Sequence, residues 1–68
     1  REEEEAMMSA VHALPHSFRE TVLLYYYQGY GIGEIAKMLD LPEGTISSRL
    51  SRGRKKLEEL LKERGIEP

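Results

Sequence analysis

A chain of 68 residues can bury one small core, so we expect a single domain. Its lack of cysteine excludes disulfide bonds and thiolate metal sites, and no apolar run approaches the roughly 18 residues that a membrane-spanning helix needs. The net charge of −2 hides an uneven distribution, because residues 1–42 carry three Lys/Arg and seven Asp/Glu whereas residues 43–68 carry seven and five. We expect a soluble, cytoplasmic protein whose C-terminal part is basic.

The N-terminal segment begins with one arginine and four glutamates, which form a poor core, so we expect residues 1–5 to be a linker remnant or a frayed first turn. Met7, Val11 and Leu14 then recur at helical spacing, which predicts a short first helix. Pro15 ends this helix, because proline lacks an amide hydrogen and biases the preceding residue away from the helix.

A second helix is expected to start near His16 or Ser17 and to run to Gln28, where the following glycine ends it. Ser17 is the candidate N-cap, with Glu20 as its capping-box partner. The helix carries a broad apolar stripe that predicts the centre of the core, namely Phe18, Val22, Leu23, Tyr26 and Tyr27. The tyrosines are therefore expected to pack rather than to stack on single-stranded bases, with Tyr25 alone exposed at the edge of the stripe.

The third and fourth helices complete an all-α, four-helix domain over residues 6–68, without strands or winged elements. The third helix is predicted over about residues 32–39, and it is followed by a break of three or four residues. The last helix is predicted over about residues 43–64, with its apolar side formed by Ile46, Leu50, Gly53, Leu57, Leu60 and Leu61. Residues 32–64 therefore make a C-terminal helix-turn-helix.

The spacing around the short turn is typical of helix-turn-helix proteins. Two helices joined this closely cross steeply, and Ala36 is the small residue that allows their close approach. Leu41, Ile46 and Leu50 follow it by five, ten and fourteen positions, as in the general motif. The position four after the alanine is commonly glycine because the turn requires positive φ, and here it is Asp40, one of the few other residues that tolerate it.

The last helix also carries a basic, polar side opposite its apolar one. On a helical wheel this side holds Ser47, Ser48, Ser51, Arg52 and Lys55. Arg49 and Lys56 fall on one flank and Arg54 on the other, where they can reach the two phosphate backbones beside a helix in the major groove. Arg52 is the strongest candidate for direct base recognition, since a guanidinium can pair bidentately with guanine.

The order of these signatures resembles region 4, the C-terminal domain, of extracytoplasmic-function sigma factors of the sigma-70 family. The resemblance covers about residues 12–62 and rests on Leu14-Pro15, Arg19-Glu20, Leu23-Leu24, Gly29, Glu34-Ile35-Ala36, Leu39, Leu41 to Ile46, Ser48-Arg49-Leu50, Arg52, Arg54 and Leu57. It implies binding to the minus-35 promoter element in transcription initiation, and docking of the first two helices on the β flap of RNA polymerase. An anti-sigma factor is a common partner in this group.

The resemblance also implies roles for particular residues of the last helix. Carried over position by position, the residues that face bases are Ser47, Ser48, Ser51 and Arg52. The residues that lie near the DNA backbone are Thr45, Arg49, Arg54 and Lys55.

The sequence departs from the family pattern at three places. Tyr25 stands where many members carry a basic residue near the DNA backbone. Gly31 replaces the usual serine N-cap of the third helix and Gly33 a helix-favouring residue, which together cost that helix on the order of 1 kcal/mol. Ser47 and Ser51 are smaller than the residues often found there, which implies a different base preference.

Other kinds of site find less support in the sequence. His12 and His16 are separated by a proline that spoils helical spacing, and no cysteine or carboxylate cluster completes a metal site. The glutamate run lacks the spaced oxygen ligands and turn glycine of a calcium loop. Without a nucleophile-base pair or a phosphate-binding glycine loop, we expect neither an enzyme nor a cofactor.

Two other functions remain open on the same residues. One is a helical protein-docking module that is bound by the β flap or an anti-sigma factor without touching DNA. The basic side of the last helix argues against it, because such a module does not need phosphate contacts. An ordinary helix-turn-helix repressor fits the motif but requires a dimerisation surface, which we do not find in so short a chain. We therefore expect a monomer.

Overall fold

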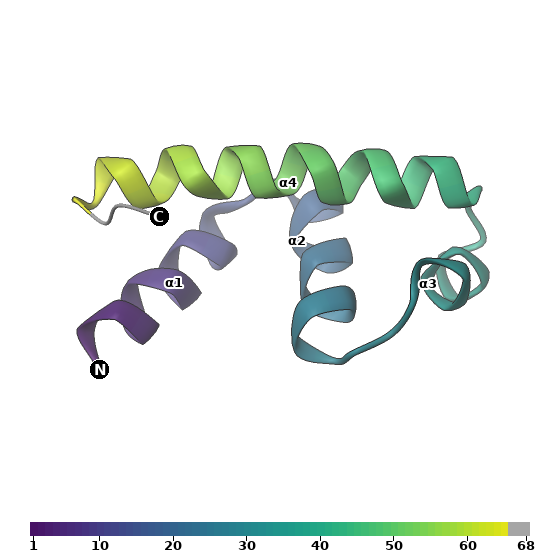
Figure 1. Cartoon of the computed structure of the whole chain (residues 1–68), viewed down its shortest axis with the longest axis horizontal. Helices are drawn as coiled ribbons and strands as arrows, with labels where there is room; N and C mark the ends of the chain where they lie inside the picture. Colours follow the sequence, from purple (N-terminus) through teal and green to yellow (C-terminus); the bar gives the residue numbers. More distant parts are fainter. Residues whose placement is uncertain (66–68) are drawn as a thin grey trace.

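The computed structural model describes residues 1–65 as a set of helices packed beneath one long helix. In chain order the elements are α1 (Glu2–Ala13), α2 (His16–Val22), the π-helical turn η1 (Leu23–Tyr27), α3 (Ile32–Leu39) and α4 (Glu43–Glu63). Figure 1 shows α4 along the whole length of the molecule, with the other helices on one side of it. The described part of the chain contains no strand, so the predicted all-α helix-turn-helix fold is confirmed.

The core lies where α2, α3 and α4 meet. Its buried residues are Leu14, Val22, Ile35, Ala36, Ile46 and Leu50. A second buried group, formed by Ala10, Val11 and Leu61, lies where α1 packs against the C-terminal half of α4 (Figure 1). The long helix therefore has two attachments, one to the helix-turn-helix and one to α1.

The first helix begins earlier than the sequence predicted. Glu2 to Glu5 form its first turn and are exposed, where a frayed turn was the expectation. Their negative charges lie at the helix N-terminus, which the partial positive charge of the helix dipole favours. The division into a linker over residues 1–5 and a domain over residues 6–68 stays a prediction.

The start of α2 corrects the predicted capping box. Pro15 is the N-cap residue and no side chain caps the helix, so the assignment of Ser17 and Glu20 to a capping box was wrong. Because the helix already begins at His16, Ser17 lies inside the first turn, where its carbonyl accepts a hydrogen bond of 2.8 Å from the Thr21 hydroxyl. This bond satisfies the hydroxyl of a side chain that is fully buried.

The end of the second helix differs from the prediction because it is a π-helical turn. The Gln28 amide donates to the carbonyl of Leu23, five residues earlier, at 3.0 Å. The wider turn advances each residue through a smaller angle than an α-helix does, so the tyrosines leave the apolar stripe. Tyr25, Tyr26 and Tyr27 are 36%, 48% and 50% exposed, so the prediction that Tyr26 and Tyr27 pack in the core and that Tyr25 alone is exposed was wrong.

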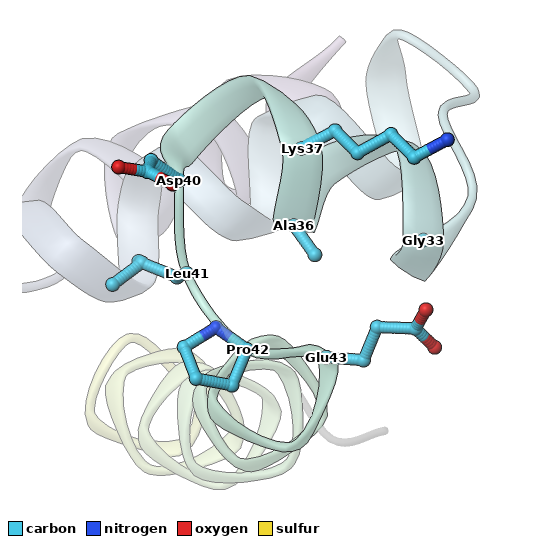
Figure 2. A pocket seen from close by; sticks show the side chains of 7 residues that line it. All are labelled: Gly33, Ala36, Lys37, Asp40, Leu41, Pro42 and Glu43. Atoms are coloured by element: carbon cyan, nitrogen blue, oxygen red, sulfur yellow. The ribbon is translucent and has the colours of Figure 1, made fainter.

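The turn between α3 and α4 confirms the expected backbone conformation. Asp40 is left-handed, with φ 56° and ψ 51°. Its amide donates to the carbonyl of Lys37 at 3.3 Å, and the Leu41 amide donates to that of Ala36 at 2.9 Å. These two bonds form a Schellman motif, which satisfies the last carbonyls of α3 and redirects the chain. Figure 2 shows Ala36 on the side of α3 that faces the start of α4.

The crossing of α2 and α4 depends on the lack of a side chain at Gly53. This residue is buried, and a Cβ atom there would lie 3.1 Å from Val22 Cγ2 and 3.4 Å from Phe18 Cβ. Neither neighbour is the free end of a flexible side chain, so the two helices are held at a separation that fits glycine. The predicted place of Gly53 on the apolar side of α4 is confirmed.

Within residues 1–65 no helix is both long enough and apolar enough to cross a membrane. The same residues contain no group of three or more His, Cys, Asp or Glu side chains that is arranged to hold a metal ion.

Candidate nucleic-acid interface

The N-terminal half of α4 has one buried and one exposed side. Ile46 and Leu50 point into the core and are 0% and 6% exposed. The side opposite them, which we call the basic face, consists of Ser47, Ser48, Ser51, Arg52 and Lys55, all of them exposed. Because α4 is the second helix of the helix-turn-helix and is anchored through its apolar side, it presents this face to solvent as one rigid surface.

Of the residues predicted to contact a DNA backbone, Lys55 belongs to the basic face, whereas Thr45, Arg49 and Arg54 lie at its edges. Arg54 is exposed, whereas Thr45 and Arg49 are half-buried. Lys56 is half-buried too and forms an ion pair with Glu59 at 3.6 Å. No other ion pair occurs within residues 1–65, so in this part of the chain no carboxylate neutralises Arg49, Arg52, Arg54 or Lys55. These cations are available to phosphate groups.

Arg54 has a contact that the sequence did not reveal. Its Nη1 donates a hydrogen bond of 3.2 Å to the hydroxyl of Tyr26, which is 28 residues away in the chain. The sequence placed Tyr26 in the core and Arg54 on the flank of the last helix, whereas in the structure Tyr26 lies in the π-helical turn and meets Arg54. In the sequence, this contact was indicated only by an arginine on the flank of the last helix and a run of three tyrosines. No sequence pattern linked the arginine to one of the tyrosines.

A recess of about 210 Å³ separates η1 from the basic face. It is lined by Tyr25, Tyr26, Ile32, Ser47, Leu50, Ser51 and Arg54. Tyr25, which stands where the family often has a basic residue, therefore lies beside two serines of the basic face. The lining combines the apolar Ile32 and Leu50 with hydroxyl and guanidinium groups, which are suited to hydrogen bonds with phosphate oxygens.

The start of α3 explains how its two glycines are accommodated. The Gly31 amide donates to the Glu34 carboxylate at 2.8 Å, which caps the helix from within although Gly31 has no side chain of its own. A Cβ atom on Gly33 would lie 3.4 Å from Glu43 Oε2. Figure 2 shows the Glu43 side chain below Gly33, on the border of a hollow between α3 and α4. The hollow lies at the turn and contains no residue of the basic face.

The two histidines lie away from the basic face. Both are exposed, and Arg19 lies between them. Arg19 Nη1 donates to the carbonyl of His12 at 3.0 Å, and its Nη2 lies 3.4 Å from His16 Nδ1. Arg19 therefore joins the backbone of His12 to the ring of His16.

The fold and the exposed face of α4 define a helix-turn-helix domain. Residues 4–57 match the family model described as sigma-70, region 4. The chain belongs to this family, which confirms the resemblance drawn from the sequence.

Three curated proteins that are named as sigma factors are similar to the chain in sequence. The chain is 42% identical over 53 residues to the "Probable RNA polymerase sigma factor RfaY" of Xanthomonas campestris pv. campestris, which covers 78% of the chain and 13% of that protein. It is 41% identical over 56 residues to the ECF RNA polymerase sigma factor SigM of Mycobacterium tuberculosis, with 82% and 29% covered. It is 34% identical over 50 residues to the ECF RNA polymerase sigma factor SigW of Bacillus subtilis, with 74% and 27% covered.

These relatives place the chain in the extracytoplasmic-function group as region 4 of such a factor. The chain spans less than a third of the length of each of the three proteins.

Proposed function

We propose that this domain binds the minus-35 promoter element and thereby helps to direct RNA polymerase to chosen promoters. The observation that carries the proposal is the basic face of α4, exposed on the second helix of a helix-turn-helix and opposite the buried Ile46 and Leu50. A helix in this position fits the major groove, where base edges carry a distinct pattern of donors and acceptors.

The proposed contacts divide into two groups. Those that face the bases are Ser47, Ser48, Ser51 and Arg52, whose short hydroxyl side chains let the helix approach while Arg52 reaches a guanine. Those that hold the backbone are Thr45, Arg49, Arg54 and Lys55, which set the position of the helix without reading sequence. The domain acts as a monomer, through one recognition helix.

The proposed protein partner is the β flap of RNA polymerase, bound by the first two helices. An apolar groove of about 330 Å³ runs between α1, α2, η1 and α4, and the residues that line it are Met7, Val11, Val22, Tyr26, Tyr27, Arg54 and Leu57. Of these, Tyr26 and Tyr27 are exposed whereas Val11 and Val22 are buried. Exposed aromatic rings beside an apolar groove are suited to a protein partner. An anti-sigma factor that covers the basic face would compete with DNA.

A titration with duplex DNA tests the proposal. The preferred element is first selected from a random duplex pool, and affinity is then measured for matched and scrambled duplexes across a salt series. We expect a preference for the matched duplex, and a linear fall of log K with log salt of about 0.9 per phosphate contact. Affinity that depends on neither sequence nor salt would contradict the proposal and favour a docking module that does not bind DNA.

Two alanine variants in the same titration separate base contacts from backbone contacts. Arg52→Ala is expected to lose about 1–3 kcal/mol of discrimination at one base pair, because it removes a bidentate contact. Arg54→Ala is expected to weaken binding to every duplex alike and to reduce the salt slope by about one unit. Equal effects of both variants on matched and scrambled DNA would show that the two groups are wrongly assigned.

A further inference from the structure

The side chain of Arg54 is held in place from outside its own helix. Its Nη1 donates to the Tyr26 hydroxyl at 3.2 Å, which is the hydrogen bond that joins the side chains of η1 and α4 within residues 1–65. Both side chains also line the recess beside the basic face, together with Ser47 and Ser51. The contact therefore lies at the edge of the surface that we propose meets DNA.

The position of the Tyr26 hydroxyl is set by η1. The π-helical turn takes Tyr26 out of the core, to 48% exposure, and brings it toward α4. The ring of Tyr25 packs against it edge to face, with the ring centroids 4.9 Å apart and the planes at 80°. An exposed tyrosine supported by a second ring has less freedom than a solitary one, so its hydroxyl is a defined anchor for the guanidinium.

The hydrogen bond to Tyr26 uses only part of the hydrogen-bonding capacity of Arg54. A guanidinium carries five N–H donors in one plane, so the bond to Tyr26 leaves four for phosphate oxygens. The tyrosine is neutral and therefore leaves the positive charge of Arg54 intact. An arginine that is already oriented loses less conformational freedom when it meets a phosphate.

We propose that Tyr26 is a positioning residue for DNA binding: its hydroxyl holds the Arg54 guanidinium toward a backbone phosphate at the recess. The inference rests on the proposed function and adds to it a residue outside the helix-turn-helix. Tyr26 acts through Arg54, so removing its hydroxyl weakens binding without changing which sequence is preferred.

A double-mutant cycle tests the proposal. Tyr26→Phe keeps the ring and its contact with Tyr25 but removes the acceptor, and we expect it to raise Kd by about threefold to tenfold for matched and scrambled duplexes alike. In the Arg54→Ala background the same substitution is expected to have no further effect, because the group through which it acts is gone. The salt slope is expected to fall with Arg54→Ala and to stay unchanged with Tyr26→Phe, which leaves the charge in place.

Tyr30→Phe serves as the matched control. Tyr30 is 37% exposed and lines the hollow between η1 and α3, away from Arg54, so its hydroxyl is expected to have no effect on Kd. Circular dichroism of each variant shows that the fold is retained.

The possible outcomes distinguish the two proposals. A Tyr26→Phe variant that binds as tightly as the unmodified chain, or that weakens binding equally in the Arg54→Ala background, overturns the positioning role and leaves the proposed function standing. An unmodified chain without sequence or salt dependence overturns the proposed function and the positioning role together.

Discussion

At the scale of single residues, Asp40 adopts the left-handed conformation that the turn of the helix-turn-helix requires. It is the only non-glycine residue of the described chain with positive φ, at 56°. The left-handed conformation costs an ordinary residue about 1–2 kcal/mol, whereas aspartate tolerates it through its short polar side chain. The sequence predicted this conformation from the position of Asp40 in the motif, because the requirement for positive φ is local to the turn.

The stability of Asp40 variants is expected to follow how readily the new residue adopts positive φ. Asp40→Ala should lower the free energy of unfolding by about 1 kcal/mol, while Asp40→Gly should stay within about 0.5 kcal/mol of the unmodified chain, since glycine adopts positive φ without a clash. Thermal unfolding followed by circular dichroism measures both, and 1 kcal/mol corresponds to a shift of about 4–8 °C for a domain of this size. An alanine variant more stable than the glycine variant would show that the turn is not strained.

At the scale of elements, the bounds of the helices near Pro, Gly and Asp40 followed from the sequence. The predicted ranges of 32–39 and 43–64 match α3 (Ile32–Leu39) and nearly match α4 (Glu43–Glu63). Residues that break or cap helices act over one turn, so their effect can be inferred locally. The π-helical turn was missed because the apolar stripe was counted at a constant 3.6 residues per turn.

The crossing of α2 and α4 gives a prediction about two glycines in the same helix. Gly53→Val is expected to lower the free energy of unfolding by about 1–3 kcal/mol, because its side chain overpacks against Val22 and Phe18. Gly44→Ala, with no atom within 4 Å of the added Cβ, is expected to raise it by about 0.5–1 kcal/mol through helix propensity.

Urea unfolding of the two glycine variants and the unmodified chain gives the three free energies. The unfolding slope should stay the same in all three, since the surface exposed on unfolding hardly changes. A Gly53→Val variant as stable as the Gly44→Ala variant would contradict the close approach of the two helices.

At the scale of the whole molecule, the proposed DNA binding depends more on where the charges lie than on the net charge. The net charge is −2, yet the basic face lies on one half of α4 while four glutamates lie in the first turn of α1. Figure 1 shows the start of α1 at the opposite end of the molecule from α3 and the start of α4. The longest dimension is 35 Å, several times the screening length of about 8 Å at physiological salt.

Replacement of Glu2, Glu3, Glu4 and Glu5 by glutamine changes the net charge from −2 to +2, since four negative charges are removed. We expect a gain in affinity for every duplex of less than about tenfold at 10 mM salt, where the screening length is about 30 Å, and no gain at 150 mM. Matched and scrambled duplexes should gain equally. A gain that persists at 150 mM, or that changes the preferred sequence, would place α1 close to the DNA.

The sequence by itself determined the all-α class, the helix-turn-helix and its turn, and the polar residues of the last helix. These follow from periodicity, helix-breaking residues and motif spacing, all of which act within a few turns of the chain. The family was inferred from a resemblance to known members and is shown by the match over residues 4–57. The tertiary structure alone decided where the tyrosines lie and that Tyr26 meets Arg54, 28 residues further on. That contact depends on the extra width of a π-helical turn and on how closely α2 crosses α4 at Gly53, and both are properties of packing between segments far apart in the chain.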